Sequence, residues 1–241
     1  MLVAQNENLP VAAAASALPE FIEKSDLVIP KIKLIQKMSE EVDKGLAKAG
    51  DLFDTMENKV VGSEGNPLEI IPLHNTKFFW MMDAVKNGKF IGVETYSPDK
   101  ANWRYDQAVK FYDKKENKMV DAYPTLVVSW FCLLVKELEE MGGGIPVRID
   151  FKSTSLETSK KLSTLITKGT FFKLPVFGRT YKLKVTKESN DKGTWNNLDV
   201  EVGTLVKKEW LDMAASFASM FQSKPSEVLV DSGFEDVTGQ V

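Results

Sequence analysis

The clearest candidate for a binding surface in this sequence is a run of basic residues with aromatic residues nearby. Between Lys168 and Lys192 there are seven lysine or arginine residues and two acidic residues, a local balance of +5, whereas the whole chain carries −3. Cations can follow the phosphates of a single-stranded nucleic acid while aromatic rings stack on its bases. The alternative is that these lysines only keep the open face of a sheet in contact with water.

An antiparallel hairpin is predicted to position this run. Apolar and polar residues alternate from Tyr181 to Thr186, so Lys182 and Lys184 are expected on the face opposite Leu183. The turn at 190–193 (NDKG) suits a chain reversal, because Asn, Asp and Gly tolerate left-handed backbone conformations. On the return strand we expect an inward set of Leu198, Val200 and Val202 and an outward set of Trp195, Asn197, Asp199 and Glu201.

The rest of the chain predicts a mainly β (α+β) fold with a meander of antiparallel strands. Strands are expected at 27–36, 51–55, 59–62, 67–73, 76–84, 89–96, 123–134 and 147–152. One short internal helix is expected to begin at Ser155 and end at Gly169, and apolar residues at helical spacing predict a C-terminal helix over 207–222. Residues 97–121 are either a long loop or a hairpin that turns near Glu116 and Asn117.

Composition limits the class of protein. The 241 residues are 43% hydrophobic and 27% charged, which is typical of a globular chain with one large or two small domains. The single cysteine, Cys132, lies in an apolar run and is expected in the core, so we predict no internal disulfide and a cytoplasmic protein. We also expect no signal peptide, no membrane span and no membrane partner.

Residues for catalysis or metal binding are sparse. The only histidine, His74, is expected in a loop after a strand and has no visible acid or base partner. One histidine and one cysteine are too few for a typical zinc site, and no phosphate-binding glycine loop or nucleophile elbow is present. We therefore expect no cofactor, no metal and no enzymatic activity, although a metal-dependent nuclease assembled from distant carboxylates stays open as an alternative.

Three segments resemble bacteriophage replication-region proteins that bind single-stranded DNA through an oligonucleotide/oligosaccharide-binding (OB) fold. They are PKIKLIQKMSEEVDKGLAKAGDLFDTMENKVVG, FKSTSLETSKKLSTLI and FGRTYKLKVTKESNDKGTWNNLDVEVG, and the resemblance covers most of 27–206. It implies an elaborated OB-type barrel with an inserted hairpin around 97–121. It also implies a non-catalytic protein that binds single-stranded DNA in phage replication or recombination, largely without regard to base sequence.

The resemblance implies two groups of DNA-binding residues, one cationic and one aromatic. The cationic candidates are Lys152, Arg179, Lys182, Lys184, Lys192 and Arg104. The stacking candidates are Trp195, Tyr181, Trp103, Tyr105 and Phe79, and core packing is the alternative for each ring.

The chain ends are expected to lie outside the folded domain. We predict a flexible arm over 1–18, a single domain over 19–221 and an acidic tail over 222–241. The tail is similar to the C-terminal tails that recruit replication or recombination partners and compete with DNA for the basic groove, except that its acidic-aromatic tip lies inside the tail. The residues of interest there are Asp231, Phe234, Glu235 and Asp236. A homo-oligomer remains open, and the alternative function is a phage structural or assembly protein that binds other proteins.

Overall fold

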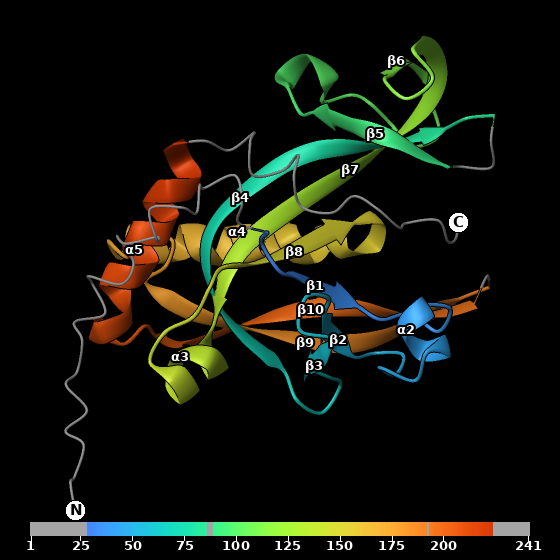
Figure 1. The fold of residues 1–241 in the computed structure, drawn as a ribbon. Coiled ribbons are helices and arrows are strands. Elements are labelled where there is room, and N and C mark those ends of the chain that lie inside the picture. The colour runs from blue at the N-terminus through green and yellow to red at the C-terminus, as the bar shows by residue number, and fades with distance from the viewer. Residues whose placement is uncertain (1–27, 86–88, 192, 224–241) are drawn as a thin grey trace, which may run out of the picture.

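The computed structural model describes residues 28–85, 89–191 and 193–223, and one ten-stranded sheet dominates them (Figure 1). The strands are β1 (Lys31–Leu34), β2 (Leu52–Asp54), β3 (Lys59–Gly62), β4 (Leu68–Asp83), β5 (Phe90–Thr95), β6 (Val109–Asp113), β7 (Lys118–Leu134), β8 (Val147–Lys152), β9 (Arg179–Asn190) and β10 (Gly193–Leu205). The helices are α2 (Glu40–Asp43), α3 (Val135–Met141), α4 (Leu156–Phe171) and α5 (Lys208–Ser223). The prediction of a mainly β chain with a C-terminal helix is confirmed.

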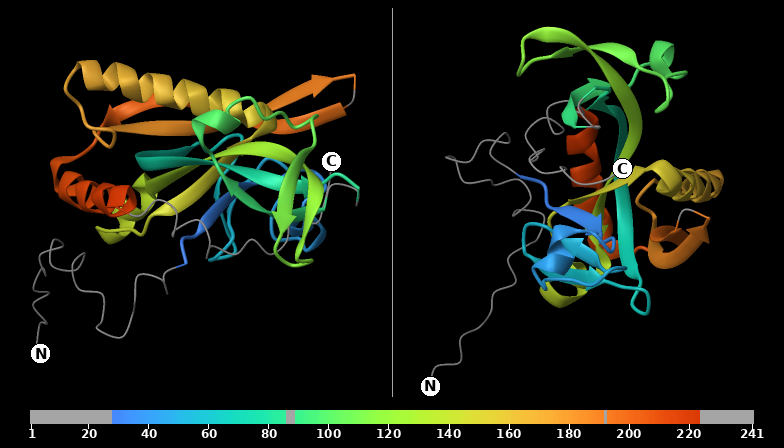
Figure 2. Two further views of the ribbon diagram at one scale, coloured as in Figure 1. Left: turned by 90° about the horizontal axis from the view of Figure 1, so that it is seen from above. Right: turned by 90° about the vertical axis from the view of Figure 1, so that its right-hand side faces the viewer.

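Two long antiparallel strands, β4 and β7, form the axis of the molecule. They pair from Ile70–Leu134 to Asp83–Ala122. The sheet order is β10-β9-β4-β7-β8-β1-β2-β3, while β5 and β6 pair with the far halves of β4 and β7. These two outer strands and the far halves of β4 and β7 make a wing that projects from the body (Figures 1 and 2). The sheet is not wholly antiparallel as expected, because β1 and β8 run parallel.

The two ends of the sheet approach one another. Gln36, just after β1, donates from its side-chain amide to the Asn196 carbonyl on β10 at 2.8 Å and accepts from the Asn196 N–H at 3.0 Å. Lys187 on β9 also reaches Glu64, in the turn after β3, at 2.9 Å. The body of the sheet is therefore curled into a partly closed barrel.

Helices cover both faces of the curled sheet. Leu162 and Ile166 of α4 pack into a core cluster with residues of β1, β2, β4 and β7 to β10. On the other side, Trp210, Met213 and Phe221 of α5 pack on β4 and β7, and the Phe221 ring stacks on Phe131 at 4.4 Å between centroids. The predicted core position of Cys132 is confirmed, since its exposed fraction is 0%.

Several predicted boundaries were wrong. Residues 68–83 form one strand instead of two, because a register shift between Pro72 and His74 lets β4 continue past the proline, and His74 therefore lies within a strand. The internal helix is not short: α4 spans 16 residues and runs through Gly169. The open region 97–121 resolves into a hairpin of β6 and β7 around Asn117.

Two further expectations concern surfaces. Val202, expected inward, is 41% exposed, while Asn197, expected outward, is 6% exposed.

Within the described parts of the chain, no helix has the length and apolar character needed to cross a membrane.

Candidate nucleic-acid interface

Lys182 and Lys184 of the predicted hairpin share one face of β9 and Lys187 lies on the other, but carboxylates accompany all three. Lys182 lies 3.8 Å from Glu69 on β4, Lys184 lies 2.6 Å from Glu201 on β10, and Lys187 is paired with Glu64. These acids lie outside the 168–192 window, so the fold reduces the positive charge that the local sequence suggested. Most of the hairpin lysines therefore already have an anionic partner.

The groove beside this hairpin is not basic either. A hollow of about 610 Å³ lies between the start of α4 and the polar face of β9 and β10. Three carboxylates line it, from Glu157, Glu188 and Asp199, and the lysine in its lining, Lys161, is held by Asp199 at 2.6 Å. This arrangement favours the alternative interpretation of the hairpin lysines as a solvated sheet face.

The structure separates the predicted aromatic candidates. Tyr181 and Phe79 are each 2% exposed and belong to core clusters, so neither ring is available to stack on a base in this conformation. Trp103 is half-buried and packs on Phe79 at 5.2 Å between ring centroids. Trp195 is also half-buried, and its buried indole N–H has no acceptor.

The remaining predicted residues are scattered. Tyr105 is 77% exposed on the wing, with Arg104 exposed beside it, whereas Arg179 is half-buried at the start of β9. Lys192 and the tail residues lie outside the described residues. Phe79 and Trp103 belong to a group of rings on the wing with Tyr96, Lys77 and Lys100, and Lys152 takes part in a cluster of cations around Trp80.

That cluster lies on one face of the central strands. Asp150 is its hub: Lys31 Nζ is 2.8 Å from one carboxylate oxygen, Arg148 Nε is 3.2 Å from the other, and the Ser129 hydroxyl donates to it. Lys33, two residues along β1 on the same face, pairs with Glu41 at 2.9 Å. The face thus carries four cations, Lys31, Lys33, Arg148 and Lys152. Two carboxylates, Asp150 and Glu41, pair with the first three.

Trp80 on β4 completes the cluster. Lys152 Nζ lies 4.3 Å from the centroid of the Trp80 ring, and Lys31 Nζ lies 5.3 Å from it, both within the range of a cation–π contact. Lys152 has no carboxylate partner within ion-pair distance among the described residues. It is therefore a cation whose nearest stabilising group is an aromatic face.

The pKa values of this cluster follow from burial and charge. Burial under neighbouring atoms and repulsion from Lys31 and Lys33 lower the pKa of Lys152 to about 8, although Asp150 acts in the opposite direction. Burial would raise the pKa of Asp150, but Lys31 and Arg148, with the Ser129 hydroxyl, hold it below its usual value. At pH 7 Lys152 is therefore mostly protonated and Asp150 is ionised.

The same sheet face continues onto the wing with exposed apolar and aromatic side chains. Register places Lys152 beside Val127, Trp80 beside Thr125 and Met82 beside Tyr123. Further along β7 the alternation brings Met119 to this face, paired with Tyr112 of β6. Tyr112, Met119 and Tyr123 are 47%, 56% and 37% exposed. We call this surface, from Lys31 and Lys33 through Lys152 and Trp80 to Tyr123 and Tyr112, the β4–β7 face.

Sequence reasoning missed most of the β4–β7 face. The pattern KIKL in β1 was a usable signal, since Lys31 and Lys33 flank the inward Ile32 and must share the opposite side. Trp80 gave no such signal, because apolar residues occupy both faces of its strand from Phe78 to Met82. The meeting of Trp80 with Lys152 depends on strand order, which short-range patterns do not encode.

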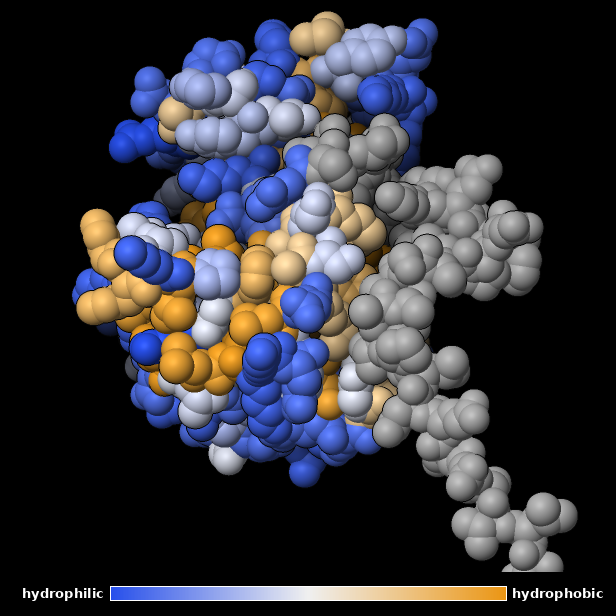
Figure 3. Space-filling view, turned by 90° about the vertical axis from the view of Figure 1, so that its left-hand side faces the viewer, coloured by the Kyte–Doolittle hydropathy of each residue, from blue (hydrophilic) through white to orange (hydrophobic). Residues whose placement is uncertain are grey.

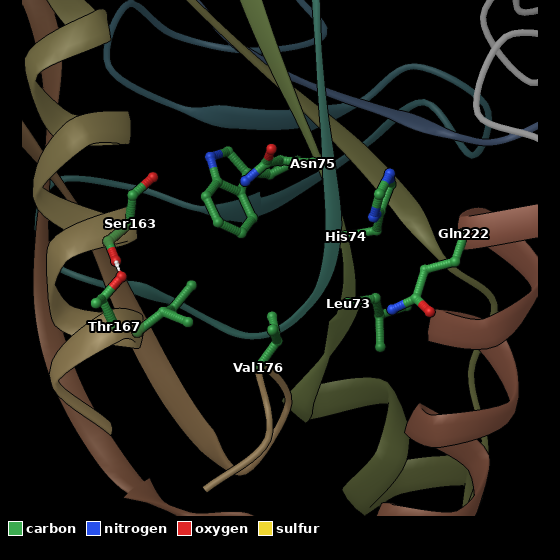
Figure 4. Close-up of a pocket in the computed structure, with 9 residues that line it drawn as sticks. Leu73, His74, Asn75, Ser163, Thr167, Val176 and Gln222 are labelled. Atoms are coloured by element: carbon green, nitrogen blue, oxygen red, sulfur yellow. Dashed lines mark hydrogen bonds between the residues drawn. The ribbon is translucent and has the colours of Figure 1, made fainter. Parts of the chain in front are cut away.

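A separate small pocket contains the only histidine. It measures about 220 Å³ and lies between β4, α4 and the end of α5, with His74, Asn75, Ser163, Thr167 and Gln222 among its polar lining residues (Figure 4). Burial lowers the pKa of His74, so the imidazole is neutral at pH 7. The Ser163 and Thr167 hydroxyls each donate to a carbonyl one turn back in α4, at 2.9 Å. The pocket therefore holds no pair of a nucleophile and a base.

Metal chemistry has no visible scaffold in the described parts of the chain. Within 28–85, 89–191 and 193–223, no group of three or more histidine, cysteine, aspartate or glutamate side chains could hold a metal ion.

Apolar side chains also reach the surface at the end of the molecule where α4 ends and α5 packs. Figure 3 views this end, and apolar residues gather over the body while polar residues dominate the wing. Phe171 and Phe172, at the end of α4, are 82% and 80% exposed, and Leu205, at the end of β10, is 59% exposed. Exposed aromatic pairs of this kind are typical of surfaces that contact another molecule.

Comparison with known proteins gives one positive result. The family model described as Pam3 phage gp34-like protein matches residues 10–227, which is most of the chain. Neither a curated protein nor a solved structure matches it.

Proposed function

The chain belongs to the Pam3 phage gp34-like protein family, and from that premise we propose that it binds single-stranded DNA without catalysis. The proposed setting is phage DNA replication or recombination, with little dependence on base sequence. The observation that carries the proposal is the β4–β7 face, which brings Lys31, Lys33 and Lys152 into line with Tyr123 and Tyr112 on one side of a sheet. This combination suits a strand whose phosphates need cations and whose bases need flat apolar surfaces.

The charges of the β4–β7 face fit a phosphate backbone better than those of the hairpin. Lys152 has no carboxylate partner, and repulsion from Lys31 and Lys33 makes an added anion favourable there. Lys182, Lys184 and Lys187 would instead have to exchange existing ion pairs for new ones. An exposed ion pair contributes little in either state, so the exchange gains little free energy.

The wing supplies the stacking surface in this proposal. Tyr112 and Tyr123 are exposed on the same face, and each base that stacks on such a ring contributes roughly 1–3 kcal/mol. Tyr105 and Arg104, on the loop of the wing, extend the surface for a strand that continues past β6. Rings contact any base through its flat face, which accounts for binding that ignores sequence.

The partly closed sheet is consistent with an elaborated OB-type barrel, and we propose that identity for the body. The support is the closure between Gln36 and Asn196 together with a nucleic-acid candidate on a strand face. The β5–β6 wing is then the insertion that distinguishes this chain from a minimal five-stranded barrel.

The C-terminal segment is assigned a regulatory part in this proposal. Residues 225–241 contain Glu227, Asp231, Glu235 and Asp236 and no lysine or arginine. Such a segment competes with DNA for a cationic surface, and its Phe234 offers an apolar anchor for a replication or recombination protein.

A second candidate function is binding of another protein during phage assembly. The exposed Phe171 and Phe172 favour it, because a surface aromatic pair is costly to leave in water without a partner. The two functions differ in where mutations act: changes at Lys152 affect DNA binding, and changes at Phe171 affect protein association.

Fluorescence anisotropy of a labelled oligo-dT tests the proposal. We expect tight binding at low salt, steep weakening as salt increases, and much weaker binding of a duplex of the same length. Addition of Mg²⁺ should leave the oligonucleotide intact, whereas degradation would indicate a nuclease. If oligo-dT does not bind at low salt, the proposal of single-stranded DNA binding is wrong, and binding of another protein is the remaining candidate function.

A further inference from the structure

Trp80 is a buried aromatic ring that packs among apolar side chains of β4, β5 and β7 and also lies beside two ammonium groups. Its side chain is 4% exposed, although it lies on the same face as the half-buried Lys31 and the exposed Lys152. The ammonium groups of these two lysines lie 5.3 Å and 4.3 Å from its centroid. An aromatic neighbour, Phe90, meets the ring edge-on at 6.2 Å between centroids.

The indole N–H of Trp80 is buried and has no acceptor among the residues that the structure describes. Buried polar groups in folded proteins almost always have a hydrogen-bond partner, so an unpaired donor needs an explanation. A bound ligand that supplies an oxygen atom at this point would give one. The donor lies within a cluster of cations, so an anionic oxygen is the acceptor that the surroundings favour.

The two lysines over the ring are held in an unfavourable arrangement. Lys31 and Lys152 carry like charges and both lie near the same Trp80 ring, and Lys33 adds a third positive charge. Asp150 offsets part of this charge, but Lys31, Arg148 and Ser129 already occupy its oxygens. An anion that entered the cluster would relieve repulsion that the protein alone does not relieve.

We propose that Lys152 and Lys31 form a displaceable cap on Trp80, which the phosphates of a single strand draw aside so that a base stacks on the uncovered ring. The inference rests on the proposed function and adds a specific subsite to it. The long lysine side chains provide the movement, since both can turn towards a phosphate without any change in the strands that carry them. The phosphate or a base oxygen then accepts the unpaired indole N–H.

The ordering of events follows from the geometry. A phosphate makes first contact with Lys152, which is the more exposed of the two caps, and the departure of that ammonium group removes the closer cation from the ring. A polyanion without bases should therefore move the cap but leave the ring without a stacked partner. A free base without phosphates should bind poorly, because the cap stays in place.

Tryptophan fluorescence with three ligands separates these steps. Oligo-dT, an abasic oligonucleotide of the same length and inorganic phosphate are each added to the full chain and to Trp80→Phe. Oligo-dT is expected to quench the emission of the unaltered protein, while the abasic strand leaves it unquenched. The chain has five tryptophans, so the quench assigned to Trp80 is the part that Trp80→Phe loses.

A second variant keeps the test independent of any disturbance to the core. Lys152→Gln removes one cap from an exposed position, and we expect acrylamide to quench its emission more strongly than that of the unaltered protein before DNA is added. Trp80→Leu should raise the Kd for oligo-dT by roughly 5- to 150-fold, the fold-change that corresponds to one lost stack.

The outcomes distinguish the subsite from the proposed function. If oligo-dT binds and Trp80→Phe shows the full quench, the subsite is wrong while single-strand binding stands. Equal quenching by the abasic strand or by inorganic phosphate would also overturn it, because no base would then be stacked. If oligo-dT does not bind the unaltered protein in the anisotropy assay, both the subsite and the function are wrong.

Discussion

Lys152 on β8 reaches across the edge of β7 and places its ammonium group 4.3 Å from the centre of the Trp80 ring on β4. Two strands that are not neighbours in the sheet are thereby joined on one face by a cation and an aromatic ring. The contact runs diagonally across β7, where Val127 pairs with Lys152 and Thr125 pairs with Trp80. Lys152 is therefore held close to Trp80 and to the other cations of this face, which lower its pKa.

Binding of single-stranded DNA should weaken as the pH rises through about 8. The pKa of Lys152 is lowered to about 8 by burial and by Lys31, so this lysine loses most of its charge between pH 7 and pH 9. Lys152→Arg stays protonated, and its affinity should change little over the same interval. Anisotropy titrations at pH 7, 8 and 9 measure the difference, and equal pH profiles for the two proteins would contradict the prediction.

The same lysine makes a prediction for stability. Its pKa in the folded chain lies below the 10.5 expected in the unfolded chain, so the unfolded state binds more protons between about pH 8 and 10.5. The contribution of Lys152 to the free energy of unfolding therefore rises with pH in that interval. Urea titrations should show this rise reduced in Lys152→Gln, and an unchanged rise would mean that Lys152 titrates normally.

Asp150→Asn should destabilise the fold strongly. The carboxylate is 5% exposed and holds both Lys31 and Arg148, so its removal leaves two cations without their counter-charge. Loss of one partner from a buried ion pair costs about 3–5 kcal/mol. Asp199→Asn is the matched control, because its pair with Lys161 is exposed and should contribute about 0–1 kcal/mol. Chemical denaturation measures both, and similar losses for the two variants would refute the assignment.

The C-terminal helix should be essential to the core. Phe221 is 0% exposed and stacks on Phe131, so Phe221→Ala is expected to lower the free energy of unfolding by about 3–5 kcal/mol. Phe171→Ala removes an equal ring from an 82% exposed site and should change stability by about 0.5 kcal/mol or less. Thermal unfolding of the two variants provides the comparison, and a small effect of Phe221→Ala would show that α5 does not contribute to the main core.

Removal of residues 225–241 should tighten DNA binding. This segment has four carboxylates and no basic residue, so it competes with phosphates for the cations of the β4–β7 face. The gain in affinity should be largest at low salt and should also appear when the four acids are replaced by their amides. A deletion that leaves the affinity unchanged at every salt concentration would show that this segment does not compete with DNA for the β4–β7 face.

Local patterns predicted the elements that are built from nearby residues. The hairpin of β9 and β10 followed from alternation on both sides of an Asn-Asp-Lys-Gly turn, and α5 followed from apolar residues at helical spacing. Patterns failed where tertiary packing overrode a local signal. The predicted strands 67–73 and 76–84 form a single strand, because a register shift next to Pro72 lets β4 continue, and Gly169 suggested a helix end although α4 runs on to Phe171.

The candidate site was less predictable than the fold. Lys152 was identified from sequence, but its partners Lys31 and Trp80 belong to strands whose order in the sheet includes the parallel pair β1 and β8. The net positive charge around the hairpin was overestimated, because Glu64, Glu69 and Glu201 lie outside the segment whose charge was counted. Charge balance is a property of the folded surface, so a window along the chain could not reveal it.

The measurement that tests the central claim most directly compares the salt dependence of oligo-dT binding in Lys152→Gln and Lys184→Gln. Both changes remove one lysine, but Lys152 lacks a carboxylate partner and Lys184 is paired with Glu201 at 2.6 Å. Loss of one phosphate contact should reduce the slope of log affinity against log salt by about 0.7 for a single strand. The account predicts this reduction for Lys152→Gln and an unchanged slope for Lys184→Gln; the reverse result would place DNA on the hairpin and contradict the β4–β7 face.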